Sequence, residues 1–189
     1  MLKHIKMSNY IWTTFIIEML NTLVNGLIVG YLTTYQGKAL IQIGLDMNLH
    51  IVYSSIFGLV IFSRVVRSMS LLTLYKVLLV IGVFYPAVIS LWFIDHNYFI
   101  YTTLIIGPVW MTANVLFLNR IDKVIADHMK EYIVDLKDSI SAYGKLVMIC
   151  SAIVASVIPY EMTFCISVVV STIAIYYEVS RLKILKQYV

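Results

Sequence analysis

The sequence predicts an all-α protein: a polytopic membrane helix bundle with six transmembrane helices, forming a single domain over residues 1–189. Three observations predict it. Hydrophobic residues make up 61% of the chain, charged residues make up 13%, and mean hydropathy is +0.89, whereas a water-soluble domain carries about 25% charged residues. Six apolar stretches of roughly 20 residues, the length of a transmembrane helix, can be placed along the chain. The cationic residues gather at alternate connections, as membrane topology requires.

The six apolar stretches are continuously apolar. This favours helices, which satisfy their own backbone hydrogen bonds in lipid, over the alternating strands of a transmembrane barrel. The predicted spans cover residues 9–35, 49–63, 71–94, 98–118, 139–158 and 162–178. The second span is the weakest, because its purely apolar run covers only residues 56–62.

Positive charge predicts the orientation. The Lys and Arg residues lie at the two termini, in the even-numbered connections or at the adjoining helix ends, and Lys38 is the single exception among 14. The positive-inside rule then places both termini in the cytoplasm. The same rule explains the net charge of +4 without nucleic acid, for which the chain has no Lys/Arg-rich tract. We expect the lipid bilayer as its surroundings and no nucleic-acid partner.

The connection over residues 119–138 differs from the others. It carries charges of both signs, and apolar residues recur between them at intervals of three and four. This pattern is typical of an amphipathic helix, which would either extend the fourth span into the cytoplasm or lie along the membrane surface. It is either a solvated connecting helix or a docking surface for a partner.

Polar residues inside the first span are candidates for function. Glu18, Asn21, Thr22 and Asn25 share one helix face at about 100° per residue. An ionised carboxylate deep in a bilayer costs several kcal/mol, so this face should turn toward other helices or a wet cavity. Glu18, Asn21 and Asn25 are therefore candidate transport or coupling residues. Alternatively, Glu18 forms a structural pair with a neighbouring helix or with Lys145.

The fourth span carries a comparable polar face, which consists of Thr103, Gly107, Trp110 and Asn114. Pro108 removes a backbone donor in its middle and is expected to kink it. Asn114 joins the candidate transport residues, although tight helix packing produces the same pattern.

Small residues at four-residue spacing predict helix packing. Gly26 and Gly30 form a GxxxG motif, which permits close approach of two backbones. In the last two spans the pairs Ser151/Ala155 and Ser167/Ser171 have the same spacing. We interpret all of these as packing surfaces.

Catalytic motifs are missing from the sequence. It has neither HExxH nor the phosphate-binding GxxxxGK[ST] pattern. Cys150 and Cys165 lie in apolar stretches without a histidine, which argues against a six-span cysteine peptidase because that chemistry needs a base beside the thiol. We expect no enzymatic activity, no cofactor and no metal site.

A short motif connects the chain to a known family. Between the second and third spans the sequence reads Ser63-Arg64-Val65-Val66-Arg67-Ser68. This is similar to the motif G-x-x-x-D-R-x-G-R-[RK] of the major facilitator superfamily, with Ser63 in place of the acid and Val66 in place of glycine. Residues 114–144 and 177–182 are also similar, and over its full length the chain resembles one six-helix half of such a transporter.

The resemblance implies a half-size transporter, or transporter subunit, that moves a small solute by alternating access, with or without coupling to protons. It implies cavity residues Glu18, Asn21, Asn25 and Asn114, cytoplasmic gating residues Arg64 and Arg67, and a homodimer or second membrane subunit that completes the pathway. The small-molecule or peptide ligand is left open.

Two other classes of membrane protein fit the same length and number of spans. One is a substrate-capturing subunit of a vitamin importer, which would engage an ATPase module. The other is a non-transport protein, such as an accessory subunit or an immunity factor against a membrane-active peptide. The excess of Ile over Ala and of Lys over Arg is typical of an A/T-rich genome, and predicts the cytoplasmic membrane of a low-GC bacterium.

Overall fold

The described part of the chain is helical. The computed structural model describes residues 2–39, 41–42, 49, 52–54, 56–58, 60, 63–83, 108–109, 112–113, 116–117, 120 and 138–186. Its labelled helices are α1 (Leu2–Thr34), α3 (Ser63–Ser68), α4 (Leu71–Val83) and α7 (Tyr160–Leu185). A further helix, Asp138–Val157, directly precedes α7. No strand occurs among these residues, so the all-α class is confirmed for them.

Within the described residues, three helices are long and apolar enough to cross a membrane. Their candidate spans are Ser8–Thr34, Asp138–Val157 and Tyr160–Ile184, and Leu71–Val83 is a shorter apolar helix. They correspond to the first, fifth, sixth and third predicted spans. The sixth was predicted to end at Glu178, but α7 continues to Leu185. The predicted amphipathic helix over 119–138 lies outside the described residues, apart from Arg120 and Asp138.

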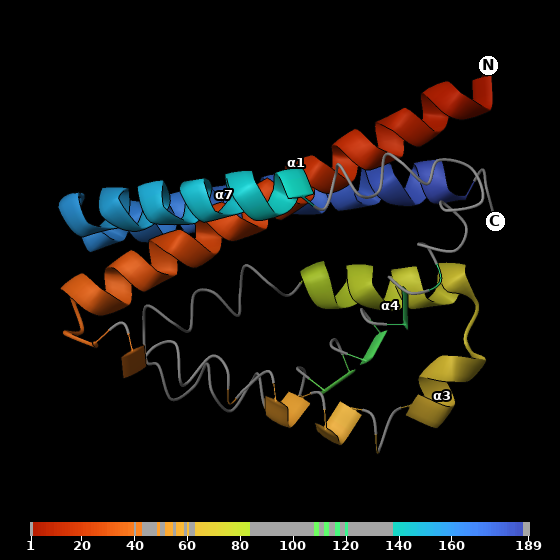
Figure 1. Ribbon diagram of the computed structural model, residues 1–189, viewed down its shortest axis with the longest axis horizontal. Coiled ribbons are helices and arrows are strands. Elements are labelled where there is room, and N and C mark those ends of the chain that lie inside the picture. The colour runs from red at the N-terminus through yellow and green to blue at the C-terminus, as the bar shows by residue number, and fades with distance from the viewer. Residues whose placement is uncertain are drawn as a thin grey trace.

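The three long helices form one group in which α1 has two neighbours (Figure 1). Phe15 of α1 meets Tyr143 near the start of the Asp138–Val157 helix, and the Tyr35 hydroxyl donates to the Ile158 carbonyl beyond its end at 2.8 Å. These two helices therefore run parallel. Tyr35 also meets Tyr160 at the start of α7, while Tyr10 shares a core cluster with Leu182 near its end. Hence α1 and α7 are antiparallel.

Glycine allows α1 to approach the Asp138–Val157 helix closely. A Cβ atom on Gly26 would lie 1.9 Å from the Ser151 Oγ, and one on Gly30 would lie 2.3 Å from the Ala152 carbonyl oxygen. Neither space admits a methyl group. The predicted packing role of the GxxxG motif is confirmed, and Ser151 forms part of the surface that receives it.

Helix α1 also packs against α7, in which small hydroxyl residues are buried. Ser167 and Ser171 are fully buried. The Ser167 hydroxyl donates to the Thr163 carbonyl at 2.8 Å, and the Ser171 hydroxyl donates to the Ser167 carbonyl at 2.7 Å. Because each hydroxyl is satisfied within its own helix, it serves as a small packing residue, as predicted.

The central position of α1 appears in its burial. In the most apolar part of α1, 50% of the residues are buried. The corresponding share is 17% in the Asp138–Val157 helix and 22% in α7. A buried cluster along α1 consists of Val24, Ile28, Val29, Tyr31 and Leu32. The outer faces of the other two helices are correspondingly exposed and apolar.

Local sequence signals define the helix ends. Gly37, just beyond the end of α1, has φ of 64°, a left-handed conformation that glycine adopts without strain, and the Lys38 amide after it donates to the Leu32 carbonyl at 3.1 Å. The Ser70 hydroxyl accepts the Thr73 amide at 3.1 Å and caps α4. Pro159 separates the last two helices and stands at the N-cap of α7.

A second core joins α4 to the end of α7 opposite Pro159. Its buried members are Tyr10, Leu74, Tyr75, Ala113, Phe117 and Leu182. The core therefore draws on α1, α4, α7 and the described part of the predicted fourth span. Gly58 of the predicted second span approaches that fourth span as well, because a Cβ atom there would lie 2.1 Å from the Thr112 Oγ1.

Candidate functional site

Two opposite charges lie in the last turns of α7. Glu178 and Arg181 are three residues apart, so they share one face of the helix. The Arg181 Nη2 donates to both carboxylate oxygens of Glu178, at 2.9 Å to Oε1 and 2.7 Å to Oε2. The Arg181 side chain is 9% exposed and that of Glu178 is 24% exposed. A charge that is so far removed from water requires a partner, and the two residues supply it to each other.

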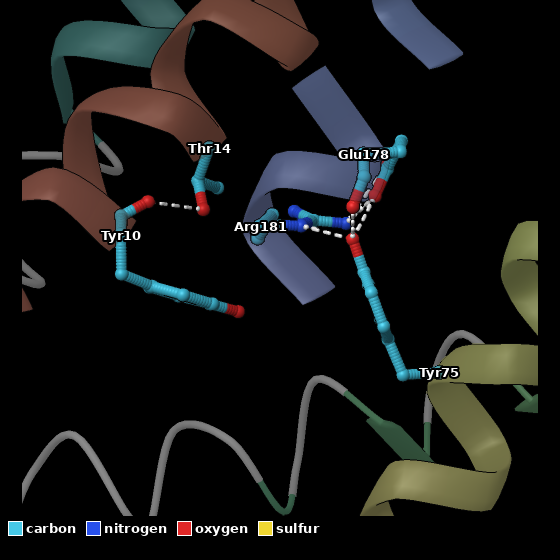
Figure 2. Close-up of polar contacts among 5 residues, drawn as sticks. All are labelled: Tyr10, Thr14, Tyr75, Glu178 and Arg181. Carbon is cyan, nitrogen blue, oxygen red and sulfur yellow. Dashed lines mark hydrogen bonds and ion pairs between the residues drawn. The ribbon is translucent and has the colours of Figure 1, made fainter. Parts of the chain in front are cut away.

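Tyr75 of α4 completes this cluster (Figure 2). Its hydroxyl donates to the Glu178 carbonyl oxygen at 2.5 Å and also contacts the Glu178 carboxylate. The Tyr75 hydroxyl oxygen in turn accepts the Arg181 Nε–H at 3.1 Å. One hydroxyl group thus joins α4 to both charged residues of α7. We call Tyr75, Glu178 and Arg181 the charge cluster.

Aromatic rings and apolar side chains enclose the charge cluster. The Arg181 guanidinium lies 5.2 Å from the centre of the Tyr75 ring and 5.9 Å from that of the Phe117 ring. Both distances are within the range of cation–π attraction. Tyr75 and Phe117 are fully buried and belong to the second core. Surroundings of this kind strengthen every electrostatic interaction within them.

Helix α1 contributes further polar groups to this region. Tyr10 is buried, and its side chain extends from α1 toward the part of α7 that carries Arg181 (Figure 2). The Thr14 hydroxyl donates to the Tyr10 carbonyl at 2.9 Å. Glu18, two helical turns further along α1, interacts electrostatically with both Arg181 and Glu178. The predicted candidate Glu18 therefore belongs to the same electrostatic environment as the charge cluster.

The polar face predicted on α1 is half-buried. Glu18, Asn21 and Asn25 are each of intermediate exposure. The Thr22 hydroxyl donates to the Glu18 carbonyl at 2.7 Å. Within the described part of the chain, the Glu18 carboxylate forms no ion pair. Lys145, its alternative predicted partner, is exposed.

The other predicted site residues lie elsewhere. Arg64 and Arg67 have exposed side chains on α3, and Asn114 lies outside the described residues. The backbone of this region is held by Arg120, whose Nη2 donates to the Arg67 carbonyl at 2.7 Å and whose Nη1 donates to the Met69 carbonyl. Arg120 thereby satisfies carbonyl groups at the end of α3, as a C-terminal cap does.

Sequence reasoning missed the charge cluster. It counted Arg181 among the cations of the C-terminus that indicate orientation, whereas the structure buries this side chain against two helices. The available signal was the pair of opposite charges at i and i+3 in an apolar helix. Nothing in the local sequence indicates Tyr75.

Metal ligands and thiols provide no further site among the described residues. No group of three or more His, Cys, Asp or Glu side chains there is placed to hold a metal ion. Cys150 and Cys165 are both free and exposed.

Comparison with protein-family models, with curated proteins and with solved structures gave no match to this chain.

Proposed function

We propose that this chain is a half-size, facilitator-like transporter or transporter subunit that moves a small solute across the cell membrane, with Glu18 as a proton-coupling residue. One observation carries the proposal: Glu18 lies inside an apolar helix of membrane-spanning length and interacts electrostatically with Arg181, an arginine that already has a carboxylate partner. Ionisable residues inside membrane segments are expensive to bury and mark transport pathways in many proteins.

The depth of Glu18 supports this interpretation. It lies ten residues beyond Ser8, where the span of α1 begins, which corresponds to about 15 Å of helix rise. Measured from Trp12, which lies six residues before Glu18, the rise is about 9 Å. Glu18 therefore lies inside the hydrocarbon core, which is about 30 Å thick, on the side nearer the start of α1. A carboxylate at such a depth requires a compensating cation, a proton or water.

The local balance of charge supports it further. Glu18 and Glu178 are two potential negative charges, and Arg181 is one positive charge that is bonded to Glu178. When both carboxylates are ionised, these three side chains therefore carry one unbalanced negative charge. A proton on Glu18, or a cationic solute beside it, would balance that charge and would be released when the surroundings of Glu18 change.

The proposal includes an architecture. Six transmembrane helices with both termini in the cytoplasm would form one half of a transport pathway in a bacterial cytoplasmic membrane. A second copy or a second membrane subunit would supply the other half. In one half of a pathway, no second half covers the polar face of α1. The intermediate exposure of Glu18, Asn21 and Asn25 fits this expectation.

Transport by reconstituted vesicles tests the role of Glu18. Vesicles that contain the protein and a pH-sensitive dye are presented with a panel of amino acids, sugars and organic cations under an imposed pH gradient. We expect at least one solute to move protons with the wild-type chain. Glu18→Gln should abolish that proton movement, because an amide cannot exchange a proton.

Glu161→Gln is the matched control, because Glu161 is exposed at the start of α7 and should leave proton movement unchanged. Proton movement that survives Glu18→Gln would exclude the coupling role. A complete lack of solute and proton movement across the panel would favour a non-transport protein.

A further inference from the structure

The outer face of the last two helices is almost entirely apolar. On the Asp138–Val157 helix the exposed side chains include Ile149, Ile153 and Val157, and on α7 they include Ile166, Val169 and Ile173. We call this surface the outer face. It lies on the side of each helix away from the residues that contact α1.

Hydroxyl groups on the outer face are satisfied within their own helices. The Ser156 hydroxyl donates to the Ile153 carbonyl at 2.7 Å, and the Thr172 hydroxyl donates to the Val168 carbonyl at 2.8 Å. A surface in contact with water has no need of such bonds, whereas hydrocarbon supplies no partner for a free hydroxyl. The outer face is therefore suited to lipid.

Aromatic rings bound this region at both ends. At one end Trp12 packs edge-on against Phe15, which packs edge-on against Tyr143. At the other end Tyr35 packs against Tyr160. Trp12, Tyr143, Tyr35 and Tyr160 are all exposed. Tyr and Trp favour the membrane–water interface, where one part of the ring is apolar and the other meets water.

The separation of these rings along the helix axis matches the thickness of a bilayer. The roughly 23 residues from Trp12 to Tyr35 rise about 35 Å along α1. The same number separates Tyr160 from Lys183, an exposed cation near the end of α7. Both lengths lie between the thickness of the hydrocarbon core, about 30 Å, and that of the whole bilayer, about 40–45 Å.

We infer that the outer face is the lipid-contacting surface of the protein. Trp12 and Tyr143 lie at one interface of the bilayer, and Tyr35 and Tyr160 lie at the other. Cys150 then lies near the midplane, because it is about equally far from Tyr143 and from the turn at Ile158. Cys165, only about one and a half helical turns beyond Tyr160, lies at a shallower depth.

Acyl chains fit this face better than a second copy of the chain does. Helices associate in membranes through small residues that let backbones approach. Three small residues of these two helices, Ser151, Ala155 and Ser167, are buried, and Gly26 and Gly30 approach the first two closely. The outer face presents mainly branched, bulky side chains, with Ser156 and Thr172 among them. This inference goes beyond transport and holds whether or not the protein moves a solute.

Spin labels on the two native cysteines test the inference in the full chain. One nitroxide is attached at Cys150 in the Cys165→Ser variant and another at Cys165 in Cys150→Ser. A reference label is attached at Glu161→Cys with both native cysteines replaced by serine. The proteins are placed in vesicles of phosphatidylcholine and phosphatidylglycerol. Collision rates are measured with oxygen, which concentrates in hydrocarbon, and with a water-soluble nickel chelate.

We expect the ratio of oxygen to nickel collisions to be highest at Cys150, intermediate at Cys165 and lowest at Glu161→Cys, with a several-fold difference between the extremes. A ratio at Cys150 no higher than at Glu161→Cys would place the outer face in water and overturn the inference. Shielding of Cys150 from both reagents, with dipolar broadening between labels, would show that a second copy covers the face, and would overturn it equally.

Discussion

A single group, the Tyr75 hydroxyl, bonds to both charged residues of the charge cluster. It accepts the Arg181 Nε–H and donates to Glu178, so it satisfies groups of both charged residues. Buried ion pairs of this kind contribute little net stability compared with apolar residues, but removal of one hydrogen-bonding partner leaves a buried polar group unsatisfied. The geometry of the cluster should therefore be sensitive to small changes.

Tyr75→Phe should lower the free energy of unfolding by about 1–3 kcal/mol, because the Arg181 Nε–H would lose its acceptor in an apolar environment. Denaturant unfolding in detergent, followed by circular dichroism, measures this change. Tyr176→Phe is the control, since Tyr176 is 69% exposed and should change stability by less than about 0.5 kcal/mol. Equal effects of the two variants would show that the Tyr75 hydroxyl makes no special contribution.

The sequence indicated the polar face of α1 but not the charge cluster, and the reason is how far apart along the chain the residues of each lie. Successive members of the set Glu18, Asn21 and Asn25 are three and four residues apart, so helical geometry alone places them on one face. Tyr75 and Arg181 are separated by 106 residues, and only the packing of α4 against α7 brings them together. A pattern within one helix contains no information about that packing.

At the scale of elements, α1 organises the bundle through its two glycines. The packing role of these glycines was predictable because the GxxxG spacing is local, whereas the sequence did not indicate that the Asp138–Val157 helix would be the partner. The end of α7 was not predictable in the same way. Glu178 looked like the end of the span because charges usually mark the water boundary, but here the charges pair and the helix continues to Leu185.

Gly30→Ala should destabilise the protein by about 1–3 kcal/mol through overpacking. The added methyl group would lie 2.3 Å from the Ala152 carbonyl oxygen and 2.8 Å from the Ala155 Cβ, and backbone cannot move aside as a flexible side chain can. Unfolding in detergent provides the measurement.

Gly82→Ala is the matched control for this substitution. Gly82 is also helical, but nothing lies within 4 Å of a Cβ atom built there. Because alanine is the better helix former, this variant should be neutral or more stable by up to about 1 kcal/mol. If Gly30→Ala were as stable as Gly82→Ala, the close approach at Gly30 would be refuted.

At the scale of the whole molecule, the helix directions bring the ends of the chain together. The N-terminal end of α1 and the C-terminal end of α7 lie at the same end of the molecule (Figure 1), because the two helices are antiparallel. Two termini on the same side of a membrane, which the distribution of Lys and Arg predicts, would require this arrangement.

The most direct test of the account is the location of the two termini in living bacterial cells. Reporter domains that are active on only one side of the membrane, such as a fluorescent protein and a phosphatase, are fused in turn to each terminus. The account predicts that both termini report the cytoplasm while the protein remains in the membrane fraction. Termini that report opposite compartments, or a chain that stays in solution without detergent, would contradict it.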